Sequence, residues 1–386
     1  MNIDSICATQ QFSSQNIRFA FDQFERDFLN AKDNHQYEAS LRAYESSNFP
    51  EDLSLRLLVL KSIFLQRERN LVVAEEVFNT VLERVQDFQW SGLYGEQLEK
   101  IGDSLHRFSN DIAYRAGFEQ YEKFINLIEE SLPDCAGKFL ILGNYQFNQC
   151  QLDEGIESCK KAMEKATTDG QRVEAINILV ASYMFTGEYD RVIEKIEETL
   201  SLKLNPNIRV NFLRKLADTY MAKGQLSEAR VALESALEVF NEFDNTLLHF
   251  TTSVREGILL AREGKYEEAL KKFWEVRQLL PNANMGQKSL VIGNVGLLLE
   301  RMREAGVEAP ATILDCLKAD IAILDDDLPL AFVQFAYEVQ KANPFARLIL
   351  GSNLVKMCEA RDLCGDGYRG KLHGRWVPFS FGWDLL

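Results

Sequence analysis

Apolar positions in the middle of the chain recur at helical spacing, in stretches that are separated by short polar turns. Four of these stretches can be laid over one another, and each predicts a helix, a tight turn and a second helix. They cover residues 139–163, 176–200, 213–237 and 253–277. The turn glycines Gly187, Gly224 and Gly264 follow one another after 37 and 40 residues, and Cys150 holds the same position 37 residues before Gly187. The pattern therefore predicts an array of paired helices.

The residues around each turn have the chemistry that paired helices require. Glycine just past a helix end favours the positive φ of a helix C-cap. Acidic residues such as Asp153, Glu154 and Glu228 open the second helix, where they meet the positive end of its dipole. Small residues near the two ends of the second helix are expected to pack inward, and they are Gly155, Ala162, Ala229, Ala236 and Ala269.

The turn sequence G-x-Y/L-x-E-A, which begins at Gly224 and again at Gly264, resembles that of the tetratricopeptide repeat (TPR). TPR units repeat after about 34 residues, so the longer spacing here implies extra helical turns or longer loops between units. The resemblance implies an all-α fold, a TPR-like solenoid in which helix pairs stack into a right-handed α–α superhelix. Residues 57–85 and 311–340 show weaker versions of the same pattern.

The chain divides into three parts on this interpretation. Residues 1–50 form an N-terminal helical segment, residues 51–361 form the helical repeats (clearest over 137–281), and residues 362–386 form an irregular C-terminal tail. Five glycines and five aromatic residues make a regular helix improbable in the tail. We expect the tail to fold back as a cap on the last repeat, and a segment that docks into a partner is the alternative.

In TPR proteins the first helix of each pair generally lines the concave side of the superhelix, so the resemblance implies which exposed side chains face a groove. Amide groups donate to and accept from a peptide backbone, and arginine forks bind carboxylates. The candidate binding residues combine amides, aromatic or methionine side chains and three arginines. They are Asn144, Phe147, Asn148, Asn177, Phe185, Asn211, Arg214, Asp218, Met221, Arg255 and Arg262. An ordinary solvated helix face, with the two phenylalanines in the core, is the alternative interpretation.

Two kinds of binding protein fit this surface. One is an adaptor or scaffold that holds another protein or a short peptide. The other resembles bacterial TPR proteins that sense signalling peptides and change conformation or oligomeric state. The carboxylate clamp of chaperone-binding TPR proteins is not reproduced, because only Asn144 matches it and Ala181 and Asp218 occupy the aligned positions. A homodimer is also compatible with the sequence.

Charge and cysteine content narrow the expected ligands and the expected location of the protein. The chain has 386 residues and a formal net charge of −15, so we do not expect direct binding of nucleic acid, which needs a basic surface. The first residues lack the features of a secretory signal, and no run of 18 apolar residues would span a membrane. Seven cysteines without a C-x-x-C pair favour reduced thiols. We therefore expect a cytoplasmic protein that does not enter a membrane.

The sequence contains no recognisable catalytic or cofactor motif. Its four histidines form no cluster with metal-ligand spacing, and it has neither a Gly-rich nucleotide loop nor a G-x-S-x-G elbow. His106 lies beside apolar neighbours in a predicted helix, as a structural histidine would. We expect no metal, no cofactor, and a function based on binding rather than catalysis.

Overall fold

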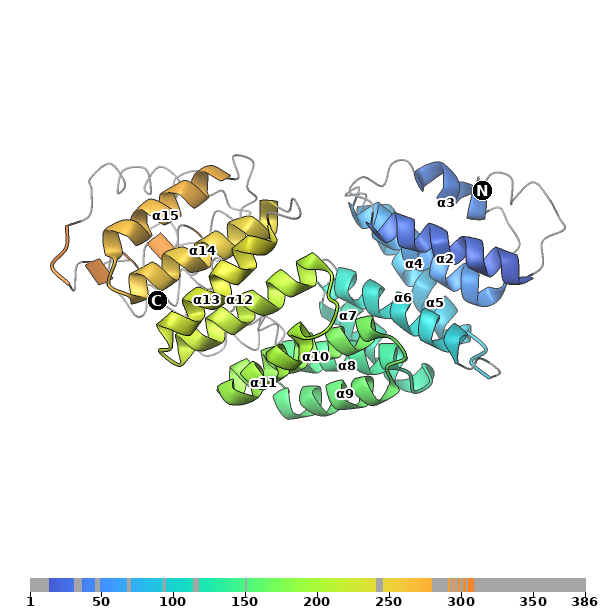
Figure 1. The fold of residues 1–386 in the computed structure, drawn as a ribbon. Coiled ribbons are helices and arrows are strands. Elements are labelled where there is room, and N and C mark those ends of the chain that lie inside the picture. The colour runs from blue at the N-terminus through green and yellow to red at the C-terminus, as the bar shows by residue number, and fades with distance from the viewer. Residues whose placement is uncertain are drawn as a thin grey trace. The chain divides into compact units, whose positions relative to one another are not determined.

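A computed structural model describes residues 14–30, 37–45, 49–67, 71–91, 93, 95–113, 118–149, 151–240 and 246–279, together with 291, 294, 295, 298, 301, 302 and 305–308. The described residues form a series of α-helices (Figure 1). They are α2 (Ser14–Asn30), α3 (Glu38–Glu45), α4 (Glu51–Arg67), α5 (Leu71–Asp87), α6 (Glu96–Ala113), α7 (Phe118–Ser131), α8 (Ala136–Asn148), α9 (Leu152–Lys165), α10 (Asp169–Thr186), α11 (Tyr189–Leu200), α12 (Pro206–Ala222), α13 (Leu226–Val239), α14 (Thr246–Arg262) and α15 (Tyr266–Leu279).

The four helix pairs predicted from the sequence are α8/α9, α10/α11, α12/α13 and α14/α15. The turn glycines Gly187, Gly224 and Gly264 adopt φ values of +76°, +75° and +78°, as a C-capping glycine requires. At the turn after α12, the backbone N–H of Gly224 donates to Met221 O at 3.0 Å, and that of Gln225 donates to Tyr220 O at 2.9 Å. These bonds satisfy carbonyls that the helix end would otherwise leave unpaired.

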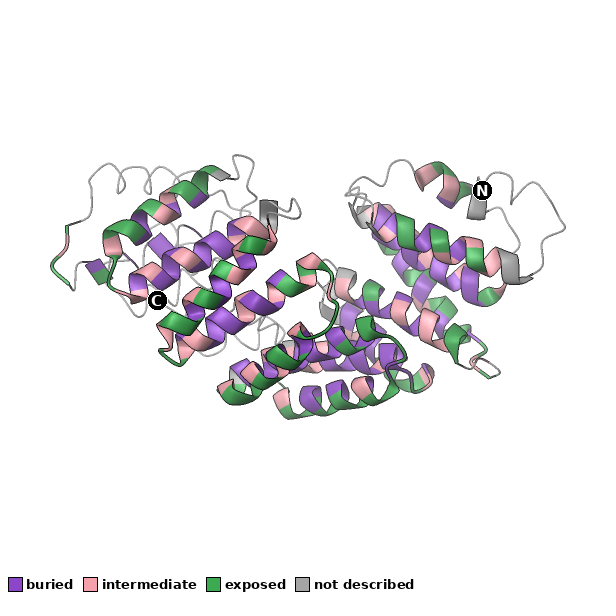
Figure 2. Ribbon diagram, in the orientation of Figure 1, coloured by how far each residue is buried: buried purple, intermediate pink, exposed green. Residues whose placement is uncertain are grey.

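The chain forms two compact units. Unit 1 comprises residues 1–147 and 151–179, and unit 2 comprises residues 148–150 and 180–386. The core of unit 1 is rich in aromatic rings, as where Phe24 and Phe28 of α2 each meet Tyr37 edge-on. In unit 2, α12 and α13 pack against each other and both carry buried positions (purple in Figure 2), among which Val210, Leu213 and Ala236 form one cluster.

The helices α6 and α8 approach each other most closely at two glycines. A Cβ atom built on Gly137 would lie 2.2 Å from the carbonyl carbon of Gly102, a distance that no side chain can adopt. Cys135 completes this contact, because its Sγ would lie 2.8 Å from a Cβ atom on Gly102. The absence of side chains at Gly102 and Gly137 therefore permits this close approach of α6 to α8.

Two sequence predictions concern segments outside the described residues. They are the weak repeat at residues 311–340 and the tail at residues 362–386, so the choice between a cap and a docking segment stays a prediction. The same holds for the predicted three-part division of the chain.

Candidate binding site

The predicted binding residues lie on the first helix of each pair. In unit 2, Asn211, Arg214, Asp218 and Met221 belong to α12, and Arg255 and Arg262 belong to α14. The remaining five are on α8 and α10, at Asn144, Phe147, Asn148, Asn177 and Phe185. The side chains of Asn148 and Phe185 lie outside the described part of the structure.

A polar cluster joins α12 to α14 in unit 2. The Arg214 guanidinium donates through Nη1 to Thr251 Oγ1 at 2.9 Å and to Asn211 Oδ1 at 3.2 Å. One turn further along α12, Asp218 Oδ2 accepts a hydrogen bond from Arg255 Nε at 3.1 Å. Arg255 also donates to the backbone carbonyl of Thr251 at 3.1 Å. The structure thus brings together four of the residues that the sequence predicts, and Thr251 is a fifth member that sequence reasoning missed.

Several of these residues are more buried than the sequence indicates. Asp218 is 2% exposed, Arg255 is 8% exposed and Met221 is fully buried, so the expectation of exposed groove side chains is wrong for these three. The physical reason is that α12 packs against both α13 and α14, which covers more than one of its faces. Arg214 is half-buried and so remains accessible.

Arg262 also ties α14 to α12. Its Nη1 donates to the Met221 carbonyl at 2.7 Å, and its side chain is half-buried. Burial and the nearby Arg301 guanidinium both lower the pKa of Arg262. Arg262 therefore serves as a link between the helices as well as a half-exposed positive charge.

Two polar atoms of the α12–α14 cluster are buried without a hydrogen-bond partner, namely Arg214 Nε and Asp218 Oδ1. Burial, together with the Arg255 guanidinium, lowers the pKa of Arg214 to about 9. Burial also raises the pKa of Asp218, although Arg255 and Arg214 oppose this. Both shifts show that the cluster holds charges in a poorly solvated place, where unsatisfied polar atoms are costly.

In unit 1 the predicted residues have different surroundings. Asn144 Nδ2 donates to Asn110 Oδ1 at 2.7 Å and so links α8 to α6. Asn110 in turn contacts the ring of His106 at 3.3 Å. Phe147 and Asn177 are half-buried. Nothing in these contacts tests whether the three predicted residues bind a ligand, and that assignment stays a prediction.

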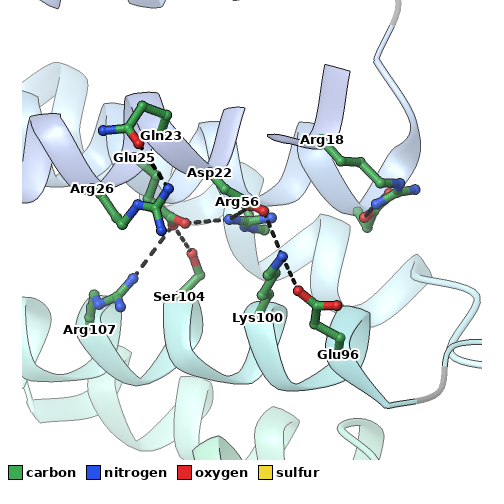
Figure 3. Close-up of polar contacts among 11 residues, drawn as sticks. Arg18, Asp22, Gln23, Glu25, Arg26, Arg56, Glu96, Lys100, Ser104 and Arg107 are labelled. Atoms are coloured by element: carbon green, nitrogen blue, oxygen red, sulfur yellow. Dashed lines mark hydrogen bonds and ion pairs between the residues drawn. The ribbon is translucent and has the colours of Figure 1, made fainter. Parts of the chain in front are cut away.

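A network of charged side chains in unit 1 joins α2, α4 and α6 (Figure 3). Arg56 of α4 lies at its centre and is 3% exposed. Its guanidinium pairs with Glu25 of α2 and donates to Asp22 of the same helix at 2.8 Å. Lys100 of α6 donates to the other oxygen of Asp22 at 2.6 Å. Sequence reasoning missed this network, because its members lie far apart in the chain and resemble ordinary surface charges.

The same network fixes Glu25 between α4 and α6. Ser104 Oγ donates to Glu25 Oε1 at 2.7 Å, and Arg107 lies 3.6 Å from the same oxygen. The contribution of Lys100 and Arg56 outweighs the effect of burial at Asp22, whose pKa is lowered. Asp22 and Glu25 each have cationic partners within the chain, so the network has the character of a structural link for α2, although Arg56 Nε is buried without a hydrogen-bond partner.

A pair of carboxylates on α6 shares one amide. Gln171 Nε2 of α10 donates to Glu99 Oε2 and to Asp103 Oδ1, at 3.0 Å each. Burial raises the pKa of both carboxyl groups, and the Asp103 charge raises that of Glu99 further. This arrangement joins α6 to α10 with one neutral donor between two acids.

One histidine and two cysteines of the described residues are buried, and burial shifts their pKa values away from neutrality. Burial lowers the pKa of His106 to about 4 and raises the pKa of the free thiols Cys135 and Cys159 to about 12. Over the described ranges, no three His, Cys, Asp or Glu side chains are grouped so that they could hold a metal ion. Within the same residues, every helix is too short or too polar to cross a membrane.

Comparison with solved structures finds the same fold in other proteins. One is a Rap protein complexed with competence and sporulation factor, at 14% identity and a TM-score of 0.52, covering 86% of this chain and 94% of that chain. Another is the apo form of RapI, at 16% identity and a TM-score of 0.51, covering 91% of this chain and 93% of that chain. No protein-family model matches the chain, and no curated protein matches it.

These likenesses confirm the fold that the repeat pattern predicts. The chain is a TPR-like helical-repeat protein with an all-α superhelical fold. At 14% and 16% identity the comparisons establish the fold alone.

Proposed function

We propose that the chain functions by binding another protein or a peptide on the polar surface of α12 and α14, rather than by catalysing a reaction. The observation that carries this proposal is the α12–α14 cluster, where Arg214 Nε and Asp218 Oδ1 are buried without partners. One is a hydrogen-bond donor and the other an acceptor, one helical turn apart. Buried unsatisfied polar atoms of a native protein call for an explanation, and a ligand that completes their hydrogen bonds supplies one.

A pull-down from native cytosol tests this function. The baits are the intact chain, a double variant Asn211→Ala/Arg214→Gln, and the control variant Arg209→Gln. Arg209 is an exposed arginine of α12 whose side chain donates to Leu200 O at 3.3 Å, away from the cluster. Arg255 is left intact, because removing it would leave the buried Asp218 carboxylate without its partner.

We expect one protein or peptide that the intact chain and the control retain and that the double variant loses. Mass spectrometry of the retained fraction, peptides included, identifies it. Equal retention by the double variant would remove the α12–α14 surface from the proposal. Circular dichroism of each bait verifies that the variants are folded.

A peptide-sensing regulator is the second candidate. It is supported by the fold shared with a Rap protein that was crystallised with competence and sporulation factor. A sensor changes conformation or oligomeric state when its ligand binds. Hydrogen exchange and light scattering, with and without the ligand recovered above, separate the two candidates: a scaffold keeps its exchange pattern outside the binding surface, whereas a sensor does not.

We also propose a cytoplasmic location. It is supported by the unpaired thiols Cys135 and Cys159, which are buried in the helix array as reduced residues. Fractionation of the native cell, followed by detection of the chain, tests it.

A further inference from the structure

The Arg214 guanidinium has no ion pair with any residue that the structure describes. Both of its hydrogen bonds use Nη1, and both acceptors, Thr251 Oγ1 and Asn211 Oδ1, are neutral groups. Its Nε is buried without an acceptor. Nη2 makes no hydrogen bond with a described residue and is not among the buried unpaired atoms, so it is the nitrogen through which the guanidinium can donate to a carboxylate from outside.

The carboxylate nearest to Arg214 is already engaged. Asp218 accepts its hydrogen bond from Arg255 at 3.1 Å and pairs with that residue. Burial raises the pKa of Asp218 even though Arg255, Arg214 and Lys215 all act to lower it. One carboxylate, that of Asp218, therefore lies near the guanidiniums of both Arg214 and Arg255, and one positive charge is left over among these three groups in a chain whose net charge is −15.

An excess positive charge in a poorly solvated place is costly unless an anion compensates for it. The neutral partners of Arg214 orient its guanidinium without neutralising its charge. Thr251 is itself held in place, because its hydroxyl donates to Leu248 O at 3.1 Å. Arg214 is half-buried, so a ligand can reach it without unfolding α12. The arrangement is that of an anion receptor whose anion comes from outside the described chain.

We propose that Arg214 binds a carboxylate group of the peptide or protein that occupies the α12–α14 surface, and that Asn211 and Thr251 position its guanidinium. This inference rests on the proposed binding function and names the chemistry that the ligand must carry. The carboxylate belongs to the C-terminus of the ligand or to an Asp or Glu side chain.

Three synthetic pools of hexapeptides, which are built otherwise from uncharged residues and have acetylated N-termini, separate these sources. The first has amidated C-termini and no acidic residue, the second has free C-terminal carboxylates, and the third is amidated with one Glu in each peptide. Each pool is passed over the immobilised intact chain, over Arg214→Gln and over the control Arg209→Gln, with retained peptides counted by mass spectrometry. A parallel run adds inorganic phosphate as a competing anion.

We expect the second or the third pool to be retained over the first by roughly ten- to hundredfold, as a charge-assisted hydrogen bond predicts. Arg214→Gln loses this preference and Arg209→Gln keeps it. Thr251→Val provides a second variant: it removes the hydroxyl that accepts from Arg214 Nη1, keeps the side-chain size and the Arg214 charge, and so lowers retention of the acidic pool. This second variant keeps the inference testable if Arg214→Gln fails to fold.

The outcomes distinguish a failure of the carboxylate assignment from a failure of the proposed binding function. Equal retention of all three pools would overturn the carboxylate assignment and leave peptide binding intact. Retention of no pool by the intact chain would overturn both the carboxylate assignment and peptide binding at this surface. A third outcome is that phosphate alone stabilises the intact chain against heat, that Arg214→Gln abolishes this stabilisation, and that no peptide binds. The anion bound by Arg214 would then be a small ion, and the assignment to a peptide carboxylate would be wrong.

Discussion

Substituting Gly137 by alanine gives a sharp test of the crossing between α6 and α8. The added Cβ would lie 2.2, 2.4 and 2.6 Å from the backbone C, O and Cα atoms of Gly102. These atoms belong to a helix backbone and not to a flexible side chain, so the helices must separate by more than an ångström to reach ordinary contact. Overpacking of this kind costs about 1–3 kcal/mol.

The chain offers a closely matched control at Gly170. Gly170 is the second residue of α10, as Gly137 is of α8, and a Cβ on it would meet only Thr168 Oγ1, at 3.8 Å. Replacing a helical glycine by alanine at such a site stabilises by up to about 1 kcal/mol. The two variants should therefore differ in free energy of unfolding by roughly 1–4 kcal/mol, with Gly137→Ala the less stable.

Urea unfolding followed by circular dichroism measures this difference, and hydrogen exchange locates it. Gly137→Ala should unfold at lower urea and exchange faster in α6 and α8, while Gly170→Ala should match or exceed the unaltered chain. Equal midpoints for the two variants would refute the reasoning, because the close approach of Gly102 to Gly137 would then not constrain the fold.

Three further predictions follow from buried groups. Arg56→Met should destabilise the chain by up to about 3–5 kcal/mol in urea unfolding, since it removes the buried cation between two carboxylates and leaves Asp22 with Lys100 and Glu25 with the more distant Arg107; a loss below about 1 kcal/mol would contradict this. Because the pKa of His106 is lowered in the folded chain, the unfolded chain binds a proton more readily between pH 6.5 and about 4. The contribution of His106 to stability is therefore complete above pH 6.5 and declines as the pH falls through that range. His106→Gln should flatten this part of the pH–stability curve. Cys135 and Cys159, with raised pKa values, should resist iodoacetamide at pH 8 in the native chain and react on unfolding, as peptide mass spectrometry would show.

The repeats are predictable from the sequence because their signals are local. Gly187, Gly224 and Gly264 adopt the positive φ that their position after a helix requires, and the helices on either side follow from spacing within about 25 residues. These signals reflect backbone geometry at the helix end and the helix dipole, and both can be recognised from the few residues around each turn.

The polar contacts between helices are not predictable in this way. Asp218 and Arg255 are both recognisable as first-helix residues, yet their pairing depends on how α14 lies against α12, 37 residues along the chain. Met221 was expected at the surface and is fully buried, because a helix that packs on two sides has a wider buried face than its polarity indicates. The Arg56 network is still harder to predict from the sequence, because each of its charged residues by itself looks like part of a solvated helix face.

The Arg56 network also has a consequence for the order of folding during synthesis. Asp22 and Glu25 emerge from the ribosome early, but their partners Lys100 and Ser104 lie 78 and 79 residues later. At about 5–20 residues per second, α2 waits roughly 4–16 seconds before α6 is available. During that interval the acidic side of α2 has only α4 to pair with. Although α2 is made before α4 and α6, it therefore acquires its complete set of contacts in this network only when α6 is available.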